Sequence, residues 1–94
     1  MLKITKLMAS DSSAVLLRLE GQVVGPWVET LRQACKEARS RDGGNGIVLD
    51  LSGVSYIDAH GVALFRELVT QRAELTNGSV YIAEQLKEVV HGHD

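Results

Sequence analysis

The run Ile47-Val48-Leu49-Asp50-Leu51 constrains the fold of this chain more than any other segment. Four of its five residues are apolar and the first two are β-branched, a composition that favours an extended strand. A strand without polar alternation is typical of a parallel sheet that is covered by helices on both faces. The segment therefore predicts an α/β fold built around a buried central strand.

Two strands and one helix are expected before this central strand. Leu2–Leu7 predicts an edge strand, and Ala14–Glu20 predicts a second strand because its apolar and polar residues alternate. These two strands are expected to pair as a hairpin. After a loop over Gly21–Pro26, apolar residues recur at helical spacing from Trp27 onward, which predicts the first helix.

Two helices and a further strand are expected after the central strand. Ser52-Gly53 predicts a turn, and Asp58 is placed to cap the second helix. Asn77-Gly78 predicts another turn, followed by a short strand over Ser79–Ala83 and a last helix over Gln85–His91. The order β-β-α-β-α-β-α implies an α/β fold with a mixed sheet of about four strands and helices packed on it.

Length and composition exclude several classes of protein. The chain has 94 residues, which predicts a single domain over residues 1–94. The formal net charge of −2 argues against a nucleic-acid partner, because such proteins present a basic surface to phosphates. No apolar run approaches the ~20 residues that span a bilayer, so no direct membrane insertion is expected. The start of the chain does not resemble a signal peptide, and the single cysteine fits a cytoplasmic protein.

The segment from Val48 to Phe65 resembles the central pattern of the STAS domain family. In that pattern a buried strand ends in Asp-Leu-Ser, and after a short apolar loop Asp-x-x-Gly opens a helix. Asp50-Leu51-Ser52 and Asp58-Ala59-His60-Gly61 match the two parts in the right order and spacing. The resemblance covers roughly residues 15–83 and implies that the whole chain is one STAS domain with a STAS-like mixed sheet.

The resemblance also implies a non-enzymatic, protein-binding regulatory module similar to the anti-sigma-factor antagonists. Such a domain docks on a kinase-like anti-sigma factor through the start of its second helix and the neighbouring loops. The kinase phosphorylates a Ser or Thr, usually just before the glycine of Asp-x-x-Gly, and the modification abolishes binding. The partner-binding residues expected from this resemblance are Ser55, Asp58, Ala59, His60, Gly61, Arg66 and Val24.

This chain departs from the family pattern at the residue on which the phosphoswitch depends. The position equivalent to the phosphoacceptor is His60, and Ala59 precedes it, so neither residue carries a hydroxyl. Control by Ser/Thr phosphorylation at the usual site is therefore not expected. His60 is expected to be an exposed contact residue rather than a phosphoacceptor or a metal ligand. Asp58 is expected to accept a hydrogen bond from the backbone N–H of His60 or Gly61.

Two alternative functions remain open. STAS subunits of bacterial phospholipid-transport ABC complexes have a similar length and bind a membrane permease, but they tend to carry Thr where this chain has Ala59. A small nucleotide-binding protein is the second alternative, although no GxxxxGK[ST] loop accompanies Asp50. An open sheet edge near the C-terminus would also favour pairing with a second copy, as a homodimer.

No catalytic residue, cofactor or metal is expected. Ser55, Asp58 and His60 are too close in the sequence to form a catalytic triad around a pocket. His91 and His93 have side chains that bind metals, but we expect them to lie on a solvated tail. The thiol of Cys35 is expected in the core, whereas Trp27 suits either the core or an exposed interface anchor.

Overall fold

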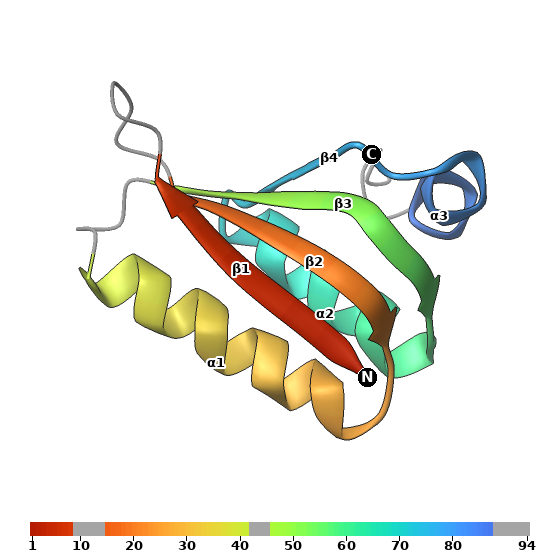
Figure 1. Cartoon of the computed structure of the whole chain (residues 1–94), viewed down its shortest axis with the longest axis horizontal. Coiled ribbons are helices and arrows are strands. Elements are labelled where there is room, and N and C mark those ends of the chain that lie inside the picture. The colour runs from red at the N-terminus through yellow and green to blue at the C-terminus, as the bar shows by residue number, and fades with distance from the viewer. Residues whose placement is uncertain (9–14, 42–45, 88–94) are drawn as a thin grey trace.

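The structure is a computed structural model, which describes residues 1–8, 15–41 and 46–87. Its elements in chain order are β1 (Leu2–Met8), β2 (Val15–Val23), α1 (Pro26–Arg41), β3 (Ile47–Ile57), α2 (Ala59–Thr70), β4 (Glu74–Thr76) and α3 (Val80–Gln85). The strands form one sheet in the order β1-β2-β3-β4 (Figure 1). β1 is antiparallel to β2, whereas β3 is parallel to both β2 and β4. The predicted element order and the mixed sheet are confirmed.

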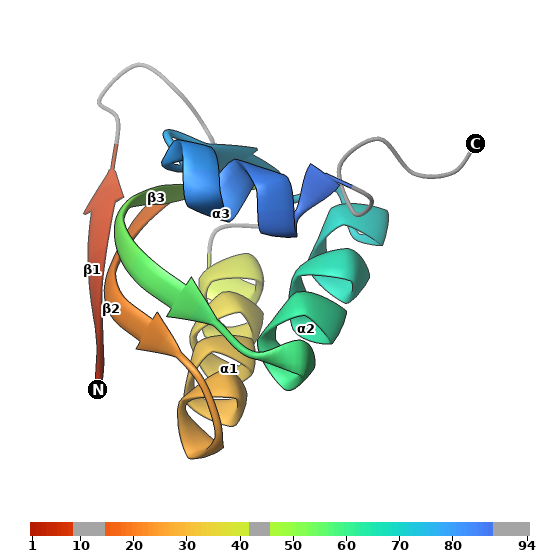
Figure 2. The same cartoon turned by 90° about the vertical axis from the view of Figure 1, so that its right-hand side faces the viewer.

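The core lies between one face of the sheet and the helices. Leu19 of β2 and Leu49 of β3 point to this face and are fully buried, as is Phe65 of α2. Figure 2 shows α1 and α2 side by side against that face. Among the described residues no helix is both long enough and apolar enough to cross a membrane.

The expectation that helices cover both faces of the central strand is wrong for the described part of the chain. Val48 points to the face opposite Leu49 and is only half-buried. It lies in register with Leu16 of β2, which is also half-buried. Cross-strand neighbours on one face lie close enough to shield each other. Apolar residues on this face can therefore be protected in part without a covering helix.

The turn predicted at Ser52-Gly53 is also wrong, because β3 continues through these residues to Ile57. The register against β2 shifts twice, and each shift leaves one extra residue on β3. Such bulges bend a strand and change which side chains point inward. From Leu51 onward the buried residues therefore recur every third position, at Val54 and Ile57. The resulting bend of β3 toward the start of α2 is visible in Figure 1.

The predicted loop over Gly21–Pro26 is shorter than expected. β2 extends to Val23, so only Val24 and Gly25 separate it from α1. Gly21 lies within the strand at φ +111, in the left-handed region that glycine adopts most readily. The backbone N–H of Trp27 then bonds to the carbonyl of Val24, which starts the helix within one short turn.

The segment around the Asn77-Gly78 turn is shifted relative to the prediction. The last strand precedes this turn, at Glu74–Thr76, so the expected strand over Ser79–Ala83 is wrong. Ser79 instead caps α3, since its hydroxyl oxygen accepts a hydrogen bond from the N–H of Ile82 at 3.2 Å. The last helix therefore begins at Val80 rather than Gln85. α3 ends at Gln85, with Leu86 as its C-cap, and residues 88–91 of the predicted Gln85–His91 helix lie outside the described residues.

Candidate functional site

Asp58 connects the start of α2 to the loop before α1. Its Oδ1 accepts a hydrogen bond from the backbone N–H of Gly61 at 2.8 Å, which confirms the predicted helix cap. Its Oδ2 accepts a second bond, from the backbone N–H of Gly25 at 3.0 Å. The backbone N–H of Asp58 in turn donates to the carbonyl of Val23. One side chain therefore holds the two segments that precede α1 and α2 together.

Gly61 allows α2 to approach the end of β2 closely. A Cβ atom at this position would lie 2.6 Å from Cγ2 of Ile57 and 2.7 Å from the carbonyl oxygen of Val23. Contacts that short do not occur in folded proteins unless neighbouring atoms move. The absence of a side chain at Gly61 thus determines how near the N-terminus of α2 lies to the sheet.

The two residues before Gly61 face solvent. Ala59 and His60 are both exposed, and neither carries a hydroxyl. His60 lines a groove of about 430 Å³ between the first turns of α1 and α2. The other residues that line this groove are Gly25, Val28, Glu29, Arg32 and Ala63.

The remaining predicted partner-binding residues do not line this groove. Ser55 is exposed on β3, where its hydroxyl donates to the carbonyl of Gly21 at 3.3 Å. Arg66 is exposed on α2, and Val24 is half-buried in the loop before α1. The structure brings Asp58 and Gly61 into contact and places His60 beside α1, whereas it does not bring Ser55 or Arg66 into the groove.

Five residues of the groove were not predicted from the sequence, and one of them, Gly25, lies in the loop before α1. Val28, Glu29 and Arg32 lie on α1, and Ala63 lies on α2. The spacing of the α1 residues is visible in the sequence, since Val28 and Arg32 lie four positions apart and therefore on one side of a helix. The sequence carries no signal that this side of α1 faces α2, because that pairing depends on the tertiary structure.

The hydrogen bonds at this site do not form a nucleophile–base pair from Ser55, Asp58 and His60. The Ser55 hydroxyl donates to a backbone carbonyl, and both carboxylate oxygens of Asp58 accept from backbone N–H groups. A catalytic triad needs the nucleophile, the base and the carboxylate bonded in sequence. In the described ranges, no three His, Cys, Asp or Glu residues are grouped so that they could hold a metal ion.

Asp50 has a structural role at the first bulge of β3. It is buried to 6% exposure, and its Oδ1 accepts from the backbone N–H of Ser52 at 3.0 Å. Its Oδ2 lies 3.6 Å from Nε of Arg18 on the adjacent strand. The carboxylate therefore supports the bulge and the β2–β3 contact.

Three further predictions concern residues away from the groove. Cys35 is buried in the core at 1% exposure, as expected. Trp27 is half-buried against the core, which favours the core interpretation over an exposed anchor. His91 and His93 lie outside the described residues.

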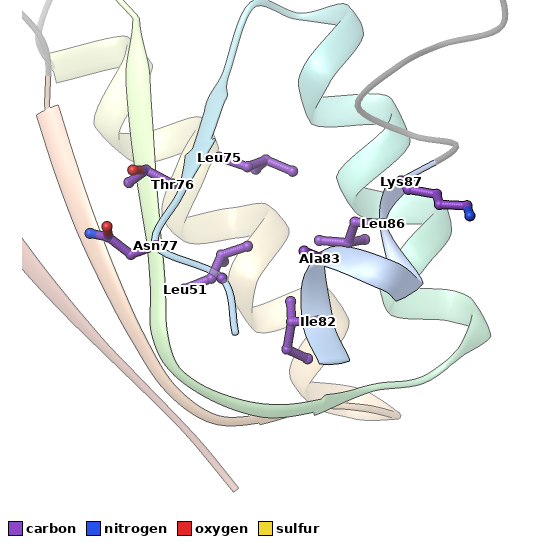
Figure 3. A pocket seen from close by; sticks show the side chains of 9 residues that line it. Leu51, Leu75, Thr76, Asn77, Ile82, Ala83, Leu86 and Lys87 are labelled. Atoms are coloured by element: carbon purple, nitrogen blue, oxygen red, sulfur yellow. The ribbon is translucent and has the colours of Figure 1, made fainter. Parts of the chain in front are cut away.

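A second hollow, of about 160 Å³, lies between α3 and the sheet (Figure 3). Its apolar lining includes Leu51 of β3, Leu75 of β4 and two residues at the α3 side, Ile82 and Leu86. Lys87 lies at its edge and is paired with Glu84 at 3.1 Å. This hollow shares no residue with the groove beside His60.

The pKa values of Asp50 and Asp58 are lowered by backbone N–H groups. For Asp58 the N–H of Gly25 has the largest effect, followed by that of Gly61. For Asp50 the backbone N–H of Ser52 has the largest effect, and desolvation opposes it. Both carboxylates are thus more acidic in the folded protein than the ordinary value of about 3.9 for an unfolded chain.

We expect these two carboxylates to make the fold sensitive to acid. A carboxyl group with a lowered folded-state pKa stabilises the fold fully above its unfolded pKa, and the stabilisation is lost as the pH falls through the folded value. The urea midpoint should therefore fall from about pH 5 downward. Asp58→Asn should be less stable than the wild type at neutral pH, because a carboxamide has one acceptor oxygen for two N–H donors. Its stability should fall less than that of the wild type as the pH is lowered. An equal fall in the urea midpoint for wild type and variant would contradict this assignment.

Comparisons with known proteins agree with the fold described above. A model of the STAS domain matches residues 6–91. The anti-sigma factor antagonist SpoIIAA, in its unphosphorylated form, has a similar structure with a TM-score of 0.65 and 23% sequence identity, over 92% of this chain and 83% of that chain. The crystal structure of Mglu is similar with a TM-score of 0.53 and 25% identity, over 71% of this chain but only 17% of that chain. No curated protein matches the chain.

Proposed function

Because the chain belongs to the STAS domain family, we propose that it is a non-enzymatic regulatory module that binds a protein partner, as anti-sigma-factor antagonists do. The binding surface would be formed by the start of α2 with the loops around it, namely Val24, Ser55, Asp58, Ala59, His60, Gly61 and Arg66. The strongest support is that the exposed residues Ala59 and His60 begin α2, directly after its N-cap Asp58, which is bonded to Gly25 and Gly61. The partner would be a kinase-like anti-sigma factor in a bacterial cytoplasm.

A preorganised surface favours protein binding because fewer groups lose conformational freedom on association. The hydrogen bonds from Gly25 and Gly61 to Asp58 hold the start of α2 against the loop before α1. Ala59 and His60 are therefore presented to solvent from a backbone with little freedom. A partner would meet the same surface in every molecule.

We further propose that this binding is not switched by hydroxyl phosphorylation at the usual site. A phosphate adds about −1.5 to −2 charge to an interface, and in the family that change abolishes binding. Neither Ala59 nor His60 provides a hydroxyl to accept it. Binding would then be constitutive, or regulated elsewhere on the module or its partner.

We expect His60→Glu to weaken partner binding about tenfold or more, because it places a permanent negative charge at the centre of the proposed surface. Affinity would be measured by co-purification and titration against the anti-sigma factor or the ABC permease encoded beside its gene. His60→Ser should keep most of the affinity, since it adds no charge. Thr70→Glu adds the same charge at the other end of α2 and should have little effect.

The same proteins test the phosphoswitch. Labelled ATP and the kinase-like partner should leave the wild type unlabelled, whereas His60→Ser should accept phosphate. Label on a serine or threonine of the wild-type surface would contradict the proposed absence of the switch. Unchanged binding by His60→Glu would exclude this surface, and binding to the permease alone would favour the lipid-transport alternative.

A further inference from the structure

The peptide unit between Ile57 and Asp58 connects β3 to the start of α2, and hydrogen bonds hold it from both sides. On one side the backbone N–H of Asp58 donates to the carbonyl of Val23 at 3.2 Å. On the other side the carbonyl of Ile57 accepts from Nε2 of Gln85, the last residue of α3, at 3.0 Å. Figure 1 shows α3 beside the bent part of β3. The orientation of this peptide unit therefore depends on α3 as well as on β2.

The carbonyl of Ile57 lies beyond the end of β4 in the sheet. Because the N–H and C=O groups of a trans peptide point in opposite directions, this carbonyl points away from β2. β4 pairs only with residues 48–50 of β3, so none of the described strands reaches it. A carbonyl that is shielded from water and lacks a donor is costly. The amide of Gln85 provides the donor that a further strand would otherwise supply.

The second polar atom of the Gln85 amide does not add to the stability of the fold. Its Oε1 is buried and accepts no hydrogen bond from any residue that the structure describes. Replacing Gln85 with methionine would remove the bond to Ile57, but it would also remove this buried acceptor. The two effects on the free energy of unfolding oppose each other. The specific contribution of the amide is therefore its contact with Ile57.

The orientation of the Ile57–Asp58 peptide determines what the Asp58 carboxylate can reach. Oδ1 accepts from Gly61 at 2.8 Å and Oδ2 accepts from Gly25 at 3.0 Å. A rotation of the preceding peptide would change the φ angle of Asp58 from −86 and move both oxygens relative to these N–H groups. Hydrogen bonds weaken steeply as their angle departs from linearity. The contact with Gln85 thus acts at a distance on the start of α2.

We propose that Gln85 is a positioning residue for the partner-binding surface defined above. Through the carbonyl of Ile57 it fixes Asp58, and with it the orientation in which the start of α2 faces a partner. This inference rests on the proposed protein-binding function and assigns α3 a part in it. Gln85 is half-buried and does not line the groove beside His60. It acts on the partner through Asp58.

Gln85→Met tests this proposal by NMR on the isotope-labelled full chain. Methionine keeps the length and the apolar stem of the side chain but cannot donate to Ile57. We expect the carbonyl carbon of Ile57 to change its chemical shift. The amide protons of Gly25 and Gly61, which bond to Asp58, should exchange about fivefold faster than in the wild type.

Gln33→Met is the matched control. It removes a glutamine amide that donates to Glu29 within α1 at 2.8 Å, and it should leave exchange at Gly25 and Gly61 unchanged. The urea midpoint should shift no more for Gln85→Met than for this control. A lower urea midpoint for Gln85→Met without selective exchange at the two glycines would mean that Gln85 is merely structural, and would overturn the proposal. An unchanged Ile57 carbonyl shift would overturn it as well.

Partner affinity separates this proposal from the proposed function. With the partner proteins used for His60→Glu, Gln85→Met should bind about two- to fivefold more weakly than the wild type, and Gln33→Met should bind equally well. If His60→Glu weakens binding and Gln85→Met does not, the surface is correct but Gln85 does not position it. Faster exchange at both glycines, with binding unchanged by Gln85→Met and His60→Glu, would support the positioning of Asp58 and overturn the proposed surface.

Discussion

Replacing Gly61 with alanine is expected to lower the free energy of unfolding by about 3 kcal/mol, at the upper end of the usual range for overpacking. The new Cβ would meet the backbone carbonyl of Val23 at 2.7 Å and Cγ2 of Ile57 at 2.6 Å. Neither group can rotate away as the end of a long surface side chain can. To relieve the contacts, α2 would have to move away from the sheet.

Gly78→Ala is the matched control for this experiment. Its Cβ would lie 3.4 Å from Cγ2 of Ile82, which is close to ordinary van der Waals contact, and its φ is not in the left-handed region. We expect a change of less than about 1 kcal/mol in urea unfolding followed by circular dichroism. If Gly61→Ala were as stable as Gly78→Ala, α2 would not approach the sheet as closely as described.

The second large effect is expected for Phe65→Ala, which should lower the free energy of unfolding by about 3–5 kcal/mol. Phe65 is completely buried and is the largest of the fully buried side chains in the described residues. A domain of this size has a total stability of about 5–14 kcal/mol. The variant should therefore be partly unfolded or poorly soluble under conditions in which the wild type is folded.

Phe65→Leu is the appropriate comparison, because it keeps most of the apolar volume. We expect Phe65→Leu to lower the free energy of unfolding by about 1–2 kcal/mol. A smaller loss than for Phe65→Ala would show that the cavity, and not substitution in α2 as such, causes the larger effect. Both variants would be measured by urea unfolding. A loss below 1 kcal/mol for Phe65→Ala would mean that neighbouring side chains collapse into the space.

Local patterns were sufficient to predict the elements whose signals are short-range. The helical spacing after Trp27 and the cap at Asp58 both involve residues within one or two turns of a helix. The secondary-structure predictions were wrong where a short sequence pattern fitted more than one structure. Ser52-Gly53 has the composition of a turn, but the bulged strand β3 continues through it. The residues after Ser79 have high strand propensity, yet they form the helix α3. In both places contacts with distant segments outweigh local propensity.

One part of the candidate site could be predicted from the sequence and another part could not. Its residues around Asp58 were recognisable because they form one contiguous segment with a family resemblance. The contact between α1 and α2 was not recognisable, because Arg32 and Glu67 are separated by 35 positions and only the packing of α1 on α2 brings them together. The assignment of the surface around His60 to partner binding stays a proposal that the variants above test.

The sequence by itself determined the element order, the cap at the start of α2 and the absence of a hydroxyl at His60 and Ala59. Only the tertiary structure decided that the Asp58 carboxylate also holds Gly25, which lies 33 positions away. It also decided that α1 and α2 form a groove. The physical reason is range: capping and periodicity act within a few residues, whereas a contact between distant segments exists only after the core has brought them together.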